Sequence, residues 1–282
     1  MRNLNDEEEI KLKKIAVNIR KKILRMIKAG RAGHVGGALS CADIMAALYF
    51  KIMRVDPQNP NWPERDRFVL SAGHKCLALY GTLSQKGFFE KSLLDTYGAL
   101  GTKLGGHPDM HKLPGVETNT GALGHGLSIA GGMALGLRMD NLDAKVFVVM
   151  GDGELAEGSN WEAAAAISHH KLDNILIFID RNTLQISGRT VDVMSYEPLD
   201  KRWEAFGWRV RVIDGNDIQQ IFENATDIPV EKGKPSKINA DTIKSKGLPF
   251  AEDKVNFHYW KVTDEELEVA EHALRQIEEG IE

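Results

Sequence analysis

The sequence is poor in the features that define several classes of protein. It has two cysteines, Cys41 and Cys76, and no secretory signal at its start, so a reducing, cytoplasmic setting is expected rather than a disulfide framework. No apolar run approaches the roughly 18 residues of a membrane-spanning helix. The formal net charge of −4 gives no basic surface for nucleic acid. These absences predict a soluble protein that binds neither nucleic acid nor membrane.

What the sequence does contain is apolar segments of strand length, separated by helix-like segments. With 43% hydrophobic residues in a length of 282, the chain can bury a large core. This alternation predicts an α/β fold, with a doubly wound, mostly parallel sheet and helices on both faces, in one domain covering residues 1–282. The strands are expected at 68–70, 146–150, 174–180, 209–213 and 237–243.

Four helix starts are predicted from residues that commonly cap helices, among them Asp217 for a helix at 217–225 and Thr263 for one at 263–277. Ser40 is expected to cap a helix at 41–53. Ser159 or Asn160 is expected to cap an alanine-rich helix at 161–169.

Residues 146–182 hold the most informative pattern, in which one apolar strand ends in Gly151-Asp152-Gly153 and a second ends at Asn182. A parallel strand–helix–strand unit places both turns at the carboxyl end of the sheet, where open α/β sheets bind ligands. Asp152 and Asn182 should therefore be neighbours, and their oxygen atoms suit Mg²⁺. The two glycines would leave room for a diphosphate. Gly-Asp-Gly alone would more often be only a tight turn.

Four other segments combine glycine and histidine next to an expected helix. They are GHVGGALS from Gly33, SAGHKCLALYG from Ser71, GGHPDM from Gly105 and TGALGHGLSIAGGMALG from Thr120. The first lacks the lysine and the glycine spacing of nucleotide-binding loops, so it is not expected to bind a nucleotide in that way. Taken alone, His34 in this loop would more often be an ordinary hydrogen-bonded residue.

Together these motifs resemble the transketolase family of thiamine-diphosphate enzymes, over residues 12–258. The Gly-Asp-Gly turn followed by Asn182 is similar to the magnesium-diphosphate motif of those enzymes. The resemblance implies that the metal ligands are Asp152, Asn182 and the main-chain carbonyl of Leu184. It also implies that the cofactors are thiamine diphosphate and Mg²⁺.

The resemblance further implies roles for several histidines and loops. His34, His107 and His258 would be catalytic or face the sugar substrate, whereas His111 has no family counterpart and is expected at the surface. The residues implied to bind the cofactor are His74, Gly121, Ala122, Leu123, Gly151, Asp152, Gly153, Glu157, Asn182 and His258.

Three positions depart from the family pattern. Ala122 stands where proline is usual and His125 where glutamine is usual, although neither change removes a backbone contact. Tyr259 replaces an expected glycine beside His258, which follows a basic loop at 244–247 that resembles the family's.

The implied activity is transfer of a two-carbon ketol unit between sugar phosphates. Neutral histidines suit the proton transfers, because their ordinary pKa lies near working pH. Full-length family members continue through pyrimidine-binding and carboxyl-terminal domains that this chain lacks. We therefore expect the amino-terminal subunit of a split transketolase, working with a carboxyl-terminal subunit in an α2β2 heterotetramer. Glu157 matches a glutamate near the junction between subunits.

Other functions remain open from the sequence. The Gly-Asp-Gly and asparagine pattern also occurs in the α subunit of 2-oxoacid dehydrogenases, although the histidines of the other motifs argue against that alternative. A fragment of a deoxyxylulose-phosphate synthase is a second enzyme alternative. A cofactor-binding module without catalytic activity is a third possibility, because a fold does not establish a function.

Overall fold

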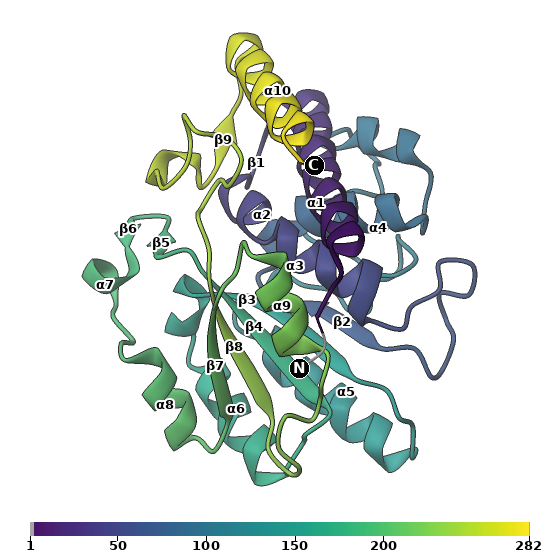
Figure 1. The fold of residues 1–282 in the computed structure, drawn as a ribbon, viewed down its shortest axis with the longest axis vertical. Helices are drawn as coiled ribbons and strands as arrows, with labels where there is room; N and C mark the ends of the chain where they lie inside the picture. Colours follow the sequence, from purple (N-terminus) through teal and green to yellow (C-terminus); the bar gives the residue numbers. More distant parts are fainter. Residues whose placement is uncertain (1–2, 282) are drawn as a thin grey trace.

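A five-stranded sheet lies at the centre of the computed structural model, which describes residues 3–281 (Figure 1). The strand order is β2-β3-β4-β8-β7, and every pair of neighbours is parallel. The strands are β2 (Arg67–Leu70), β3 (Val146–Gly151), β4 (Ile175–Arg181), β7 (Arg209–Asp214) and β8 (Ser236–Asp241). The strands predicted from the sequence agree with these bounds within two residues.

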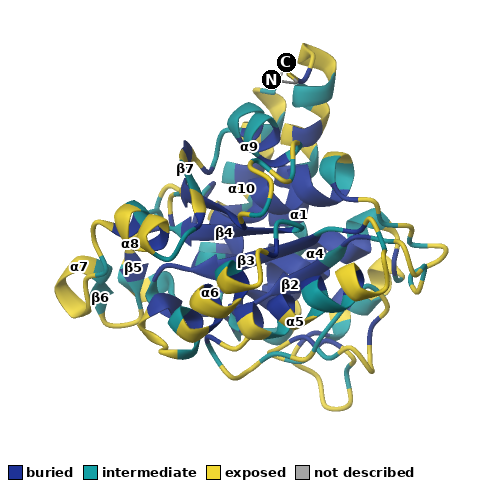
Figure 2. Ribbon diagram, turned by 90° about the horizontal axis from the view of Figure 1, so that it is seen from below, coloured by how far each residue is buried: buried dark blue, intermediate teal, exposed yellow. Residues whose placement is uncertain are grey.

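Helices cover both faces of the sheet (Figure 2), so the predicted fold class is confirmed. One face carries α1 (Asp6–Gly30), α3 (Ala42–Ala47), α4 (Cys76–Lys86), α9 (Ile218–Ala225) and α10 (Asp264–Glu279). The other face carries α5 (Gly126–Met139), α6 (Ser159–His169) and α8 (Leu199–Ala205). No helix within residues 3–281 combines the length and apolarity needed to cross a membrane.

The central strands are buried on both sides because their side chains alternate between two cores. In β3, Phe147 and Val149 pack in the core that contains α1 and α4, whereas Val146, Val148 and Met150 pack in the core that contains α5 and α6. A strand with two buried faces is usually apolar on both, which explains the uninterrupted run before Gly151.

The remaining elements are short and lie mainly around the sheet's edges. They are α2 (Gly36–Ser40), η1 (Leu48–Ile52), η2 (Gly73–Lys75), η3 (Lys91–Thr96), η4 (Gly153–Ala156), α7 (Thr190–Val193) and η5 (Val255–Phe257). Two antiparallel ladders pair β1 (Ala32–Gly33) with β9 (Trp260–Lys261), and β5 (Leu184–Gln185) with β6 (Gly188–Arg189). Because Gly33 pairs with Trp260, the first ladder brings His34 close to His258.

The predicted cap at Ser40 is wrong. Ser40 is the last residue of α2, and its hydroxyl donates to Asp180 Oδ2 at 2.6 Å. The expected helix at 41–53 is divided into α3 and η1, which is a π-helix. A tertiary contact with the sheet has replaced the local cap that the sequence suggested.

The predicted caps at Ser159 and Asn160 are also wrong, because both residues lie inside α6. Ser159 Oγ donates to the carbonyl of Gly124 at 3.0 Å, and Asn160 Nδ2 donates to the carbonyl of Glu154 at 2.7 Å. These side chains fasten the loops at Gly124 and Glu154 to the start of α6.

Candidate functional site

A cavity of about 310 Å³ lies at the carboxyl ends of β3 and β4. Gly151 pairs with Asp180 in parallel register, so the Gly-Asp-Gly turn and Asn182 lie side by side, as predicted. The predicted site residues that line the cavity are His34, His74, His107, Leu123, Gly151, Asp152, Gly153, Asn182, Leu184 and His258. The fold thus brings together most of the predicted residues, from separate segments of the chain.

Asp152 is a buried carboxylate in the wall of this cavity. Its Oδ1 accepts a hydrogen bond from Gly153 N at 2.9 Å, and its Oδ2 accepts one from Thr183 N at 2.6 Å. Burial, followed by repulsion from Asp180, raises the pKa of Asp152 to about 6 in spite of these bonds. A carboxylate in such surroundings is stabilised in its charged form by a cation placed beside it.

The carbonyl of Leu184 already accepts a cationic donor in this structure. Lys244 Nζ lies 3.0 Å from this oxygen and 3.0 Å from His258 Nδ1. Burial, followed by repulsion from Lys75, lowers the pKa of Lys244 to about 8. The carbonyl oxygen of Leu184 therefore points into the cavity and accepts from a cationic group, even though burial disfavours the charge of that group.

Three histidines form a cluster in the cavity. The ring centroids of His34 and His74 are 5.2 Å apart, those of His34 and His258 are 5.5 Å apart, and those of His74 and His258 are 5.6 Å apart. Burial lowers the pKa of His74 to about 2 and of His258 to about 4, and nearby lysines add to both shifts. Burial also lowers the pKa of His34. The lowered pKa values favour the neutral form of all three rings at pH 7.

Sequence reasoning missed a buried ion pair beside the cavity. Lys75 Nζ lies 2.5 Å from Oδ2 of Asp180, which is fully buried at the end of β4. Burial alone would lower the pKa of Lys75, but attraction to Asp180 raises it overall. The available signals were a charged residue at the end of an apolar strand and a lysine directly after His74.

Glu154 was also missed, although it directly follows the Gly-Asp-Gly turn. Its Oε1 accepts from Gly124 N and its Oε2 from Gly151 N, both at 3.0 Å, and the hydroxyl of Ser71 also donates to it. Burial raises the pKa of this carboxyl group against the effect of these bonds. Glu154 therefore joins the loop before α5 to the turn after β3.

We expect Glu154→Gln to lower the free energy of unfolding by about 1.5–3 kcal/mol, the usual cost of losing a hydrogen bond to a charged group. A glutamine amide cannot accept from both Gly124 N and Gly151 N, because one of its two terminal atoms is a donor. Urea unfolding of the purified chain measures the change. Glu157→Gln is the matched control, since Glu157 is exposed and should change stability little. Equal stability of both variants would contradict this role for Glu154.

Three predicted cofactor residues do not line the cavity. Gly121 and Ala122 are exposed, although a Cβ placed on Gly121 would lie 4.0 Å from the His107 ring. Glu157 is exposed as well, and its side chain packs against Gly124. Their roles toward a cofactor stay predictions.

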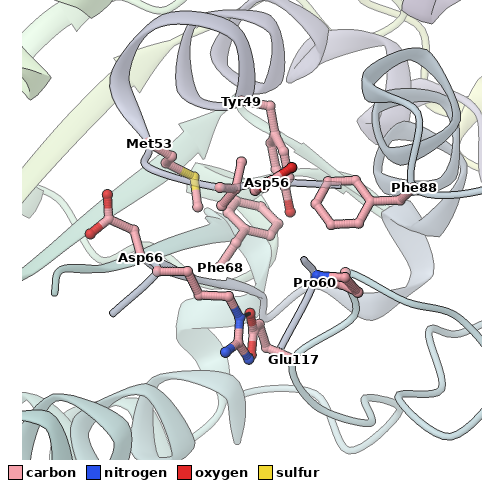
Figure 3. A pocket seen from close by; sticks show the side chains of 11 residues that line it. Tyr49, Met53, Asp56, Pro60, Asp66, Phe68, Phe88 and Glu117 are labelled. Atoms are coloured by element: carbon pink, nitrogen blue, oxygen red, sulfur yellow. Dashed lines mark hydrogen bonds and ion pairs between the residues drawn. The ribbon is translucent and has the colours of Figure 1, made fainter. Parts of the chain in front are cut away.

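A second pocket is too small to compete as a cofactor site. Figure 3 shows it beside Tyr49, Phe68 and Phe88, with Glu117 at its rim. Its volume of about 10 Å³ is near the lower limit for a single water molecule. Pockets of about 320 and 570 Å³ lie elsewhere, but neither is lined by a predicted site residue. The cavity at the sheet edge is the better candidate site because Asp152, Asn182 and the histidines line it.

Comparison with known proteins agrees with the geometry of that cavity. Residues 12–276 match the sequence model of the family described as transketolase, thiamine diphosphate binding domain. The chain belongs to the transketolase family. The predicted family and its thiamine-diphosphate-binding fold are thus confirmed.

Several transketolase relatives are similar to this chain over most of its length. It is 46% identical over 263 residues to a subunit of the apulose-4-phosphate transketolase of Phocaeicola vulgatus, covering 93% of this chain and 92% of that protein. It is 46% identical over 259 residues to a 6-deoxy-6-sulfo-D-fructose transketolase subunit of a Clostridium species, covering 92% of this chain and 94% of that protein.

The solved transketolase of Campylobacter jejuni has a similar fold, with a TM-score of 0.87 and 32% sequence identity. The match covers 94% of this chain but 42% of that one. This chain thus spans less than half the length of that transketolase, whereas it spans nearly all of the two relatives named as subunits.

Proposed function

We propose that this chain is the amino-terminal subunit of a two-chain transketolase and forms a single domain that binds thiamine diphosphate and Mg²⁺. The assembled enzyme would transfer a two-carbon ketol unit from a ketose phosphate to an aldose phosphate. The observation that carries this proposal is the cavity itself. Asp152 and Asn182, whose side-chain oxygens can bind a metal ion, line it together with a cluster of neutral histidines.

The residues of the cavity fit the proposed cofactors. The side-chain oxygens of Asp152 and Asn182 and the carbonyl of Leu184 are the hard ligands that Mg²⁺ prefers. Within residues 3–281, no cluster of three or more histidine, cysteine or acidic side chains is arranged to bind a metal ion. Phosphate and water oxygens would therefore complete the metal's coordination. A Cβ on Gly153 would lie 2.9 Å from Gln185 Cβ, so the turn has no room for a side chain.

The histidines are arranged to hold and move protons. When bound, thiamine diphosphate supplies a carbon nucleophile and an electron sink for cleavage of the ketose. Because the Lys244 ammonium donates to His258 Nδ1, the neutral His258 ring carries its proton on Nε2. His258 could therefore donate from Nε2 to a substrate oxygen. His34 and His107, which line the same cavity, would contact the sugar.

The proposed partner is a carboxyl-terminal subunit in an α2β2 heterotetramer. The names of the two similar relatives support it, because each is called one subunit of a transketolase. The partner would supply the aminopyrimidine pocket, its activating glutamate and most contacts to the substrate phosphate. Buried, free Cys41 and Cys76 are compatible with the proposed cytoplasmic setting.

The test is a mixing experiment. We expect the purified chain to be inactive alone and to gain ketol transfer from xylulose 5-phosphate to ribose 5-phosphate when a candidate carboxyl-terminal subunit is added. Activity should rise to saturation at equal molar amounts, because the cofactor is shared across the interface. Cofactor and Mg²⁺ should also stabilise the complex more than the isolated chain.

Full activity of the chain alone would contradict the two-chain proposal. A further outcome is that the chain binds the cofactor but shows no activity with any ketose phosphate or cognate partner tried. That result would favour the alternative of a cofactor-binding module without catalytic activity.

A further inference from the structure

Lys75 is a buried cation whose position is fixed by Asp180. The lysine is 2% exposed and lies in the wall of the cavity, at the end of η2. Besides binding Lys75, Asp180 Oδ2 accepts a hydrogen bond from Ser40 Oγ at 2.6 Å, and the hydroxyl of Thr242 donates to Oδ1. Asp180 is held from several elements and therefore gives the ammonium group one defined place.

Two glycines make room for this lysine. A Cβ on Gly37 would lie 2.9 Å from Lys75 Cε, which is too close for a side chain at that position. A Cβ on Gly151 would lie 3.5 Å from Lys75 Nζ, so the ammonium group lies directly against the Gly-Asp-Gly turn. The loop at Gly37 and the turn at Gly151 thus place the lysine where a ligand of that turn would lie.

The ammonium group has unused hydrogen-bonding capacity. It carries three N–H groups, and Asp180 provides its one hydrogen-bond acceptor among residues 3–281. Lys244, in contrast, is bonded to both Leu184 O and His258 Nδ1. A buried ammonium group with free donors is costly unless a ligand satisfies them. The surroundings of Lys75 therefore favour an anion in the cavity.

We propose that Lys75 binds phosphate oxygens of the cofactor's diphosphate, with Asp180 as its positioning residue. This inference rests on the proposed function, because it assumes a diphosphate at the Gly151 turn. The charges near the cavity are consistent with it. Lys75 and Lys244 both line the cavity, and Lys75 lies at the Gly-Asp-Gly turn where the diphosphate is proposed to bind.

The test measures binding of inorganic diphosphate with Mg²⁺, and separately of thiamine diphosphate with Mg²⁺, by calorimetry on the chain assembled with its carboxyl-terminal subunit. Lys75→Met should weaken both by roughly 10- to 100-fold, the loss expected for a charge-assisted hydrogen bond. Lys237→Met is the matched control, because Lys237 is also buried but lies 5.0 Å from the Trp203 ring and outside the cavity lining. The affinity of the Lys237→Met variant for both diphosphates should equal that of the unmodified chain.

Because Lys75→Met leaves Asp180 without its partner, a double variant with Asp180→Asn restores the charge balance. Weak binding by a folded double variant supports the proposal. Affinity restored to that of the unmodified chain would overturn it, since the lysine would then only balance Asp180. Failure of the unmodified assembly to bind either diphosphate would instead contradict the proposed function, and the inference with it.

Discussion

Asp152→Ala should abolish Mg²⁺-dependent retention of thiamine diphosphate while leaving the fold largely intact. The expected loss exceeds the roughly 10- to 100-fold that removal of an outer-shell partner costs, because Asp152 is the proposed metal ligand itself. The substitution removes bonds to Gly153 N and Thr183 N, but it also removes a carboxylate whose charged form is disfavoured by burial. Calorimetric titration of the assembled enzyme, together with a melting curve of the metal-free chain, measures both effects.

Asp227→Ala provides the control for that experiment, since Asp227 is an exposed aspartate in the segment after α9. It should change neither cofactor retention nor melting temperature. Unchanged cofactor affinity in Asp152→Ala would remove the metal site from the proposed function.

The metal affinity should also depend on pH through the same carboxyl group. The pKa of Asp152 is raised from an ordinary 3.8 to about 6, so between these values the folded chain holds a proton that the unfolded chain has released. This group's contribution to the stability of the metal-free chain therefore falls as pH rises through that window. Since Mg²⁺ and the proton compete, Mg²⁺ affinity should fall by roughly tenfold per pH unit below about pH 6. In Asp152→Ala, urea unfolding of the metal-free chain should lose this group's contribution to the pH dependence of stability.

His34→Ala and His107→Ala should each lower turnover of the assembled enzyme by roughly 10²- to 10⁴-fold, the range typical of lost acid-base groups. His34 lies in the histidine cluster with a lowered pKa, and His107 lines the cavity from the loop before α5. Neither side chain belongs to the apolar cores, so the melting temperature should change little. Steady-state kinetics and thermal unfolding separate the two quantities.

His111→Ala is the control for these variants, because His111 is exposed in the same loop as His107 and does not line the cavity. Its turnover should be normal. A large loss of stability with normal turnover in His34→Ala or His107→Ala would show that the histidine serves packing instead.

The sheet and the position of the Gly-Asp-Gly turn beside Asn182 could be predicted from the sequence. Both depend on apolar runs and turn residues within short segments of the chain. A strand buried on two faces is usually a near-continuous apolar run, and β3 and β4 show such runs shortly before Asp152 and Asn182. The rule that parallel strands present their carboxyl ends at one edge then placed Asp152 beside Asn182 without any structure.

The buried charges could not be predicted in that way. Lys75 and Asp180 are 105 residues apart. Neither hydrophobic periodicity nor the residue preferences of turns can predict a contact between them. Glu154 looks like an ordinary acidic residue near a helix start until the loops at Gly124 and Gly151 fold around it. The prediction that Ser40 caps a helix was wrong for the same reason, because its hydroxyl bonds to Asp180, a residue distant in the sequence.

The ladder between β1 and β9 ties the histidine cluster to two helices that do not line the cavity. Gly33 pairs with Trp260, so the segment that carries His34 is held against the segment that carries His258. β1 directly follows α1, and α10 begins shortly after β9. Because α1 and α10 pack against each other in one core, their contact helps to hold the two histidines together from outside the site.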